Sequence, residues 1–210
     1  MKPIVITMGD PSGISAEIIL KTWLDREKEM LHPFFIVDCE KRIKRIIKFL
    51  DLNVNTKVIN DPFEAKNIFK DRLPVFKLKQ EVSSELGKPC SNNAEQILES
   101  LNVSINLVYE KKASALVTSP LSKEILLKSG FNYLGQTEFI ARTLEKKTNK
   151  KFEEIMILST TKPDDQGSNL KVGLVTTHIP IGKIKENLSK KKIIEKIHSF
   201  HSSLEKLWGI

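Results

Sequence analysis

The chain has 210 residues, 40% of them hydrophobic, which provides enough apolar material for a sizeable core in one large domain or two small ones and argues against disorder. It lacks the run of about 18 apolar residues that a membrane helix needs, and Met1 leads directly into PIVIT without a signal sequence, so we expect a cytoplasmic protein. Lysine and arginine number 34 against 26 aspartates and glutamates, a formal net charge of +8.

This positive charge does not by itself indicate a nucleic-acid partner. Most of the excess is lysine spread along helical segments beside glutamate, as in FEAKNIFKDR, and no basic motif with interleaved aromatic residues accompanies it. We therefore expect no nucleic-acid and no membrane partner, while an anionic small substrate suits the charge well. Cys39 and Cys90 lie far apart without a CxxC motif, so we expect both to be reduced.

Short β-branched runs alternate along the chain with longer segments of helical periodicity. We expect strands at residues 3–7, 34–38, 56–60, 74–78, 115–118, 155–158 and 171–176. We expect helices at residues 15–25, 39–51, 92–111, from 122 onward, at 137–147 and in the last segment. Asn92 or Asn93 can cap the third of these helices. The last helix carries an apolar stripe that includes Ile193, Ile197 and Phe200.

This order predicts an α/β fold with a mixed sheet and flanking helices. Repeated βα units give parallel strands, whereas the polar STTKPDDQGSN segment predicts a hairpin-type loop between two antiparallel strands. Within that loop DDQG, residues 164–167, serves turn formation, and we assign it no chemistry. No internal domain boundary stands out in 1–210. Gly209 is expected to cap the last helix, and Ile210 either begins another strand or folds back onto the core.

The first motif that could carry chemistry is TMGDPSGISAEI, residues 7–18, a strand followed by a glycine- and proline-containing loop and a helix. Gly9 and Gly13 allow backbone conformations that a side chain would forbid, and free N–H groups at the helix start favour an anion. The motif is neither GxGxxG nor a P-loop, so an ordinary tight βα turn is the competing interpretation.

The second motif is ALVTSPLSKE, a strand that breaks at Ser119-Pro120 and continues as a helix. Ligands bind at the carboxyl ends of strands in α/β sheets, so Thr118, Ser119 and Lys123 are candidate contacts for a phosphate or hydroxyl group. Ser122 is a candidate helix cap.

The third motif is GFNYLGQTEFIA, residues 130–141, in which Gln136 and Thr137 lie at a glycine turn into a helix. Glu138 lies in the first helical turn, where the helix dipole favours a carboxylate. Gln136 and Thr137 are candidates for polar recognition, and a capping role for Thr137 is the alternative.

The fourth motif is VGLVTTHIPI, which places His178 after a strand and before Pro180. The proline turns the backbone away from the strand, so the imidazole is expected to project at the sheet edge. A catalytic metal generally needs about three protein ligands, and the other histidines offer poor companions. His198 and His201 form a pair on a lysine-rich helix, and His32 has no evident relation to His178.

Taken together, these four stretches resemble the PdxA family, the 4-hydroxythreonine-4-phosphate dehydrogenases of pyridoxal phosphate biosynthesis. MGDPSGISAEI is similar to the family's MGDPaGIGPEi, ALVTSPLSK to ALVTgPi.K, GQTEFIA to GHTEfLA, and VGLVTTHIPI to valvTTHiPl. Their order and approximate spacing also match, and a joint match over residues 7–181 is far more specific than any single motif.

The resemblance implies a fold similar to isocitrate and isopropylmalate dehydrogenases, with two lobes and a homodimer whose cleft borrows residues from the partner. It implies that NAD (or NADP) takes hydride from 4-phosphooxy-L-threonine and that the product loses CO2, giving 3-amino-2-oxopropyl phosphate. A divalent metal, Zn, Mg or Co, fits that chemistry because it can acidify the hydroxyl and polarise the ketone. On this resemblance His178 matches one of three histidine metal ligands, and Gln136 and Thr137 match the substrate-binding His-Thr pair.

The sequence departs from the family pattern at three places. Gln136 stands where histidine is usual, Ser15-Ala16 replace Gly-Pro, and the segment that supplies the other two metal histidines and most of the nicotinamide site has no counterpart. We therefore expect 1–210 to be the N-terminal two-thirds or so of the fold, with the C-terminal portion missing. Two alternatives stay open: a dehydrogenase of a related four-carbon phosphorylated acid, erythronate or threonate 4-phosphate, and a non-catalytic binding module.

Overall fold

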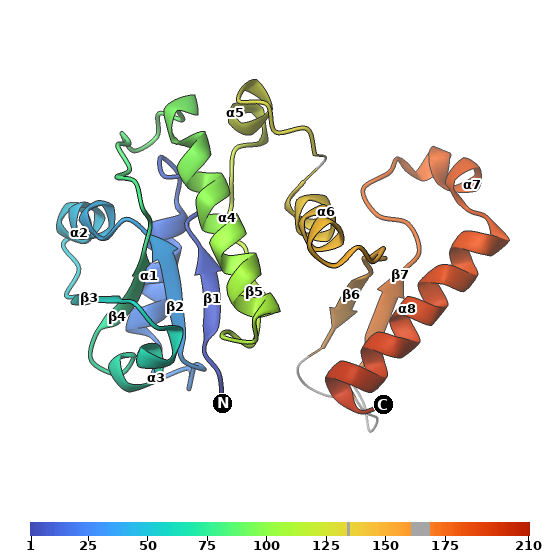
Figure 1. Ribbon diagram of the computed structural model, residues 1–210, viewed down its shortest axis with the longest axis horizontal. Helices are drawn as coiled ribbons and strands as arrows, with labels where there is room; N and C mark the ends of the chain where they lie inside the picture. Colours follow the sequence, from blue (N-terminus) through green and yellow to red (C-terminus); the bar gives the residue numbers. More distant parts are fainter. Residues whose placement is uncertain (134, 161–168) are drawn as a thin grey trace. The chain divides into compact units, whose positions relative to one another are not determined.

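The computed structural model describes residues 1–133, 135–160 and 169–210, so the predicted DDQG turn lies outside the described residues. The chain forms two compact units, Met1–Gln136 and Thr137–Ile210 (Figure 1). The boundary between them falls within the third sequence motif, at the start of a helix.

The first unit is built on a five-stranded sheet with the order β3-β4-β2-β1-β5, and each of its pairings is parallel. Its strands are β1 (Ile4–Thr7), β2 (Phe34–Asp38), β3 (Thr56–Ile59), β4 (Leu73–Lys77) and β5 (Leu116–Val117). Every residue of β2 is buried, as expected for a central strand covered on both faces. The predicted strands are confirmed. The sheet is parallel rather than mixed, because the antiparallel strands form a separate sheet in the second unit.

Helices lie on both faces of this sheet. The helices of the first unit are α1 (Ser15–Leu24), α2 (Glu40–Phe49), α3 (Ala65–Ile68), α4 (Ala94–Tyr109) and α5 (Lys123–Lys128), with the 3-10 turns η1 (Pro62–Glu64) and η2 (Ser91–Asn93). In Figure 1, α4 lies in front of β1 and β2, and α1 lies behind them. The core on the α1 side joins Trp23, Ile43, Phe34 and Phe69, from two helices, a strand and the end of α3.

The start of α4 differs from the sequence prediction. Asn93 occupies the N-cap position, but its side-chain amide donates to the Ser83 carbonyl at 2.7 Å and makes no capping bond. The asparagine cap is therefore wrong, because the side chain finds a carbonyl acceptor in a distant loop that the local sequence does not reveal.

The second unit consists of α6 (Gln136–Thr148, from Thr137 onward), a two-stranded sheet and a long helix. Its other elements are β6 (Met156–Ser159), β7 (Lys171–Leu174), η3 (Ile181–Lys183), α7 (Ile184–Asn187) and α8 (Lys190–Trp208). β6 and β7 pair antiparallel, as predicted. A Cβ added to Gly173 of β7 would lie 2.9 Å from the Phe200 ring, so glycine is what allows α8 to approach the strand.

The end of α8 follows the sequence prediction, whereas its apolar stripe does so only in part. Gly209 has φ +68 and caps the helix, with its N–H bonded to the Glu205 carbonyl. Phe200 packs on β7, but Ile197 of the predicted stripe is 58% exposed. Among the described residues, no helix is both long enough and apolar enough to span a bilayer.

Candidate functional site

The candidate site lies where β1 and β5 end side by side. The two strands are parallel neighbours, so the loop after Thr7 and the loop after Val117 emerge at the same edge of the sheet. The helix that follows β1 and the helix that precedes β5 lie on opposite faces, as Figure 1 shows for α1 and α4. Such a switch point opens a crevice at the carboxyl ends of strands, which is where α/β proteins bind ligands.

Gly9 fixes how closely these two loops approach. It has φ +68, in the left-handed region, and a Cβ added to it would lie 2.5 Å from the Pro120 carbonyl oxygen and 2.7 Å from Cβ of Ser119. Only glycine satisfies both the backbone conformation and the space. The first and second sequence motifs are therefore in direct contact.

Hydrogen bonds then join the two loops. The Asp10 N–H and the Ser15 hydroxyl both donate to the Pro120 carbonyl, at 2.8 and 3.0 Å. The Ser119 N–H donates to Oγ1 of Thr7 at 2.9 Å, and the Ser119 hydroxyl donates to the Thr7 carbonyl at 2.6 Å. Because its hydroxyl proton bonds the Thr7 carbonyl, Ser119 could make the predicted contact to a phosphate or hydroxyl group only as an acceptor. Thr118 and Lys123, the other two candidates, are exposed.

A buried serine that the sequence analysis missed supports the start of the glycine loop. Ser100, on the middle of α4, accepts from the Met8 N–H at 2.9 Å and donates to the Val37 carbonyl at 2.8 Å. It is fully buried, and its two bonds fix β1 relative to β2 at the carboxyl edge of the sheet. A polar residue within an apolar helical stripe was the signal that could have revealed it.

A buried ion pair, also missed, holds the same loop from the other side. Arg42 is 1% exposed and Asp38 is fully buried, and the guanidinium binds both carboxylate oxygens, at 3.0 and 2.6 Å. A third guanidinium N–H donates to the Pro11 carbonyl at 3.2 Å. Arginine can make these three bonds at once because its donors form a rigid planar fork.

The third motif joins the site through one side chain. The Gln136 amide nitrogen donates to the Ser119 carbonyl at 3.1 Å, while Oε1 is buried and has no partner among the described residues. Lys123 lies beside this turn, with Nζ 3.9 Å from the position of a Cβ on Gly135. Thr137 is exposed as the second residue of α6, so it is not the N-cap of that helix.

His178 belongs to the second unit, in the loop after β7. It is exposed and has φ +56, whereas Asp51, Lys111 and Asn149 have similar φ values directly after helix ends, where a left-handed cap is common. His178 follows no helix. Left-handed backbone costs about 1–2 kcal/mol in a residue with a side chain, and such strain often accompanies functional sites.

The metal site that the family resemblance implies is not complete in the described residues. No group of three or more histidine, cysteine, aspartate or glutamate side chains able to hold a metal ion is found in the described ranges. His198 and His201 are exposed on α8, and His201 contacts Glu205 at 3.7 Å. These residues alone therefore do not make a complete metal centre.

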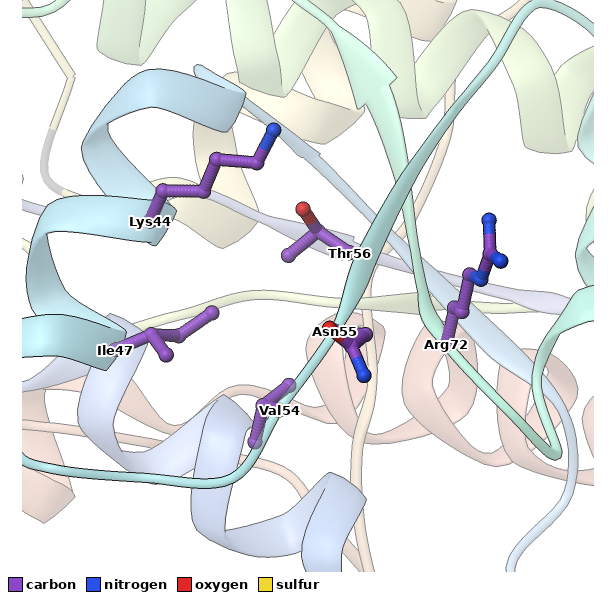
Figure 2. Close-up of a pocket in the computed structure, with 6 residues that line it drawn as sticks. All are labelled: Lys44, Ile47, Val54, Asn55, Thr56 and Arg72. Atoms are coloured by element: carbon purple, nitrogen blue, oxygen red, sulfur yellow. The ribbon is translucent and has the colours of Figure 1, made fainter.

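One hollow of the first unit lies away from this site. Figure 2 shows it between α2 and the beginnings of β3 and β4, and its volume is about 410 Å3. Six residues line it: Lys44, Ile47, Val54, Asn55, Thr56 and Arg72. Burial raises the pKa of the neighbouring Glu40, but hydrogen bonds from Lys44 and Thr56 outweigh burial, so the pKa lies below its ordinary value. Because this hollow opens at the amino ends of the strands, we do not assign it to the site.

Comparisons with known proteins agree with the motifs. The family model described as "Pyridoxal phosphate biosynthetic protein PdxA" matches residues 29–210. The chain is similar to the 4-hydroxythreonine-4-phosphate dehydrogenase of Zymomonas mobilis, with 33% identity over all of this chain and 58% of that protein. The enzyme of that name from Sulfurihydrogenibium is 30% identical over all of this chain and 60% of its own length.

A solved structure shows the same fold. The crystal structure of a 4-hydroxythreonine-4-phosphate dehydrogenase from Burkholderia phymatum matches with a TM-score of 0.81 and 22% identity, over 98% of this chain and 59% of that one. This chain therefore spans about three-fifths of the length of the relatives that it matches.

Proposed function

Because the chain belongs to the PdxA family, we propose that it is the N-terminal part of a nicotinamide-dependent dehydrogenase acting on 4-phosphooxy-L-threonine. The reaction oxidises and decarboxylates this substrate to 3-amino-2-oxopropyl phosphate in pyridoxal phosphate biosynthesis. NAD or NADP, when bound, would accept the hydride that the substrate loses. We propose a homodimer, on the family resemblance alone.

One structural observation carries this proposal. Segments separated by more than a hundred residues in the sequence, the glycine loop and the turn at Ser119-Pro120, meet at the ends of β1 and β5 together with Gln136. These are the family's first three motifs, and they converge where α/β sheets bind ligands. Gln136 is partly buried and its amide bonds the Ser119 carbonyl, and Thr137, which follows it, is exposed.

His178 is proposed as one ligand of a divalent metal. The support is an exposed imidazole at φ +56 in the motif that resembles the family's TTH segment. Since the described residues offer no complete ligand set, the remaining ligands would have to come from outside the described residues. No chemical step is assigned to a metal on the residues of this chain alone.

Gln136 is the reason to keep a second candidate from the same family. An amide cannot carry the charge of an imidazolium, so this position differs from the family's histidine, and erythronate or threonate 4-phosphate is the alternative substrate. The two candidates differ at one substituent, an amino group against a hydroxyl group.

The proposal is tested by measuring substrate binding and hydride transfer separately. Isothermal titration of 1–210 with 4-phosphooxy-L-threonine is expected to show binding, and replacing the exposed Thr137 by valine should weaken it. Lys146→Gln at the distal end of α6 is the matched control and should leave affinity unchanged.

Hydride transfer is expected to fail in the same sample, because one histidine and part of a cofactor site bind metal and NAD poorly. Absence of any binding of 4-phosphooxy-L-threonine would contradict the proposed substrate. Rapid NAD reduction by 1–210 alone would contradict the view that the site is completed from outside this chain.

A further inference from the structure

The hollow between α2 and the beginnings of β3 and β4 is separate from the site at the ends of β1 and β5 (Figure 2). It lies at the amino ends of its strands, whereas the glycine loop and Ser119-Pro120 lie at the carboxyl ends of theirs. Its volume of about 410 Å3 falls within the range of about 300–1,000 Å3 that is usual for small-molecule pockets. The hollow therefore admits a small molecule that does not compete for the proposed substrate site.

Polar and apolar groups line different ends of this hollow. In Figure 2 the polar ends of the Lys44, Thr56 and Arg72 side chains lie towards the top of the view. The aliphatic side chains of Ile47 and Val54 lie towards the bottom. Val54 belongs to the hydrophobic core on the α1 side, and Ile47 packs against that core, so the apolar end is held by packed elements. A hollow divided in this way fits a ligand with one charged end and one apolar end.

The polar end of the hollow keeps one cation without a partner. The Lys44 ammonium group lies 3.0 Å from the Glu40 carboxylate, which also accepts a hydrogen bond from the Thr56 hydroxyl at 2.9 Å. The Arg72 guanidinium group makes no hydrogen bond or ion pair with any residue that the structure describes. Since one carboxylate offsets one of the two cations, the polar end can accept one further negative charge.

We propose that this hollow binds a small organic acid that has a single carboxylate and an apolar body. The carboxylate lies at the end that carries Arg72, and the body lies against Ile47 and Val54. A guanidinium group binds a carboxylate through two parallel hydrogen bonds, so one arginine matches one planar anion. A phosphate monoester is the poorer ligand, because the Glu40 carboxylate beside Lys44 repels its second charge.

The test is an amide NMR titration of 1–210 with hexanoate, at neutral pH and constant ionic strength. The backbone amides of Ile47, Asn55 and Thr56 should shift and reach saturation together. Hexanamide has the same chain without the charge and should bind at least about tenfold more weakly, because a charge-assisted hydrogen bond is about twice as strong as a neutral one. Acetate has the charge without the chain and should also bind at least about tenfold more weakly, because it buries fewer methylene groups. Hexyl phosphate should bind no more tightly than hexanoate.

A charge-removing variant identifies the cation that holds the carboxylate. Arg72 is exposed, so Arg72→Gln should fold, should weaken hexanoate binding by about tenfold and should leave hexanamide binding unchanged. Lys66→Gln is the matched control, because Lys66 is exposed on α3, carries the same charge and does not line the hollow. Its affinity for hexanoate should equal that of the unaltered chain.

Four outcomes would overturn the inference. They are equal binding of hexanoate and hexanamide, tighter binding of hexyl phosphate, an unchanged hexanoate affinity in Arg72→Gln, and amide shifts spread over the lysines of α8 instead of the hollow. The comparisons of ligands use the unaltered chain, so they decide the point even where the variant does not fold. None of these measurements uses 4-phosphooxy-L-threonine, so the proposed function stands or fails separately.

Discussion

Replacing Arg42 by methionine should destabilise the first unit by about 3–5 kcal/mol. The change removes two hydrogen bonds to Asp38 and one to the Pro11 carbonyl. The Asp38 carboxylate, which is fully buried, then keeps only the Cys39 N–H at 2.6 Å. Leaving such a charge unpaired in the interior accounts for most of the expected loss, because removing one partner of a buried pair typically costs that much.

The assay is urea unfolding followed by the fluorescence of a single tryptophan. The chain has two tryptophans, so a Trp208→Phe background leaves Trp23 as the reporter of the first unit. Trp23 is 3% exposed and donates to the Phe69 carbonyl at 3.0 Å, so its emission should follow the loss of this core. Lys48→Met on the same helix is the matched control, since Lys48 is exposed and its loss should cost about 0.5 kcal/mol or less.

A double change separates an unpaired charge from lost packing. Asp38→Leu combined with Arg42→Met removes both charges and should cost much less than the sum of the single changes. A loss below about 1 kcal/mol in Arg42→Met would refute the reasoning, since it would mean that the carboxylate is not desolvated. Additive costs in the double variant would refute it as well.

The remaining predictions concern a glycine contact and a carboxylate. Gly9→Ala should destabilise the first unit by more than Gly87→Ala. Both glycines have a left-handed φ, but only at Gly9 would the new Cβ meet the Pro120 carbonyl, because nothing lies within 4 Å of a Cβ at Gly87. Equal losses of stability in urea unfolding would contradict the close approach at Gly9. Glu40 has a lowered pKa, so the stability that it contributes is present above its unfolded pKa and is lost as pH falls through its folded pKa, below the ordinary value of 4.5. Glu40→Gln should therefore flatten the fall in stability in that acid range, and an unchanged pH profile would argue against the bonds from Lys44 and Thr56.

The strands and helices followed from local patterns because burial imposes a period on the sequence. The apolar run at 34–38 became a fully buried central strand, and Gly209 took the left-handed cap that the end of a helix favours. The asparagine cap failed for a physical reason: a polar side chain chooses among all acceptors within reach, and Asn93 found one at Ser83. Burial of a charged side chain within a helix, as at Arg42, also has no local signature.

The sequence by itself determined the order of strands and helices, the motifs that relate the chain to the PdxA family, and Gln136 as a departure from the third motif. Only the tertiary structure decided that the glycine loop contacts Ser119-Pro120, that the Ser15 and Ser119 hydroxyls bond carbonyls across these loops, and that Gln136 bonds the Ser119 carbonyl. Secondary structure depends on neighbours a few residues away, which the sequence displays. The polarity of a site depends on which donors and acceptors pair across more than a hundred residues, and folding alone brings those groups together.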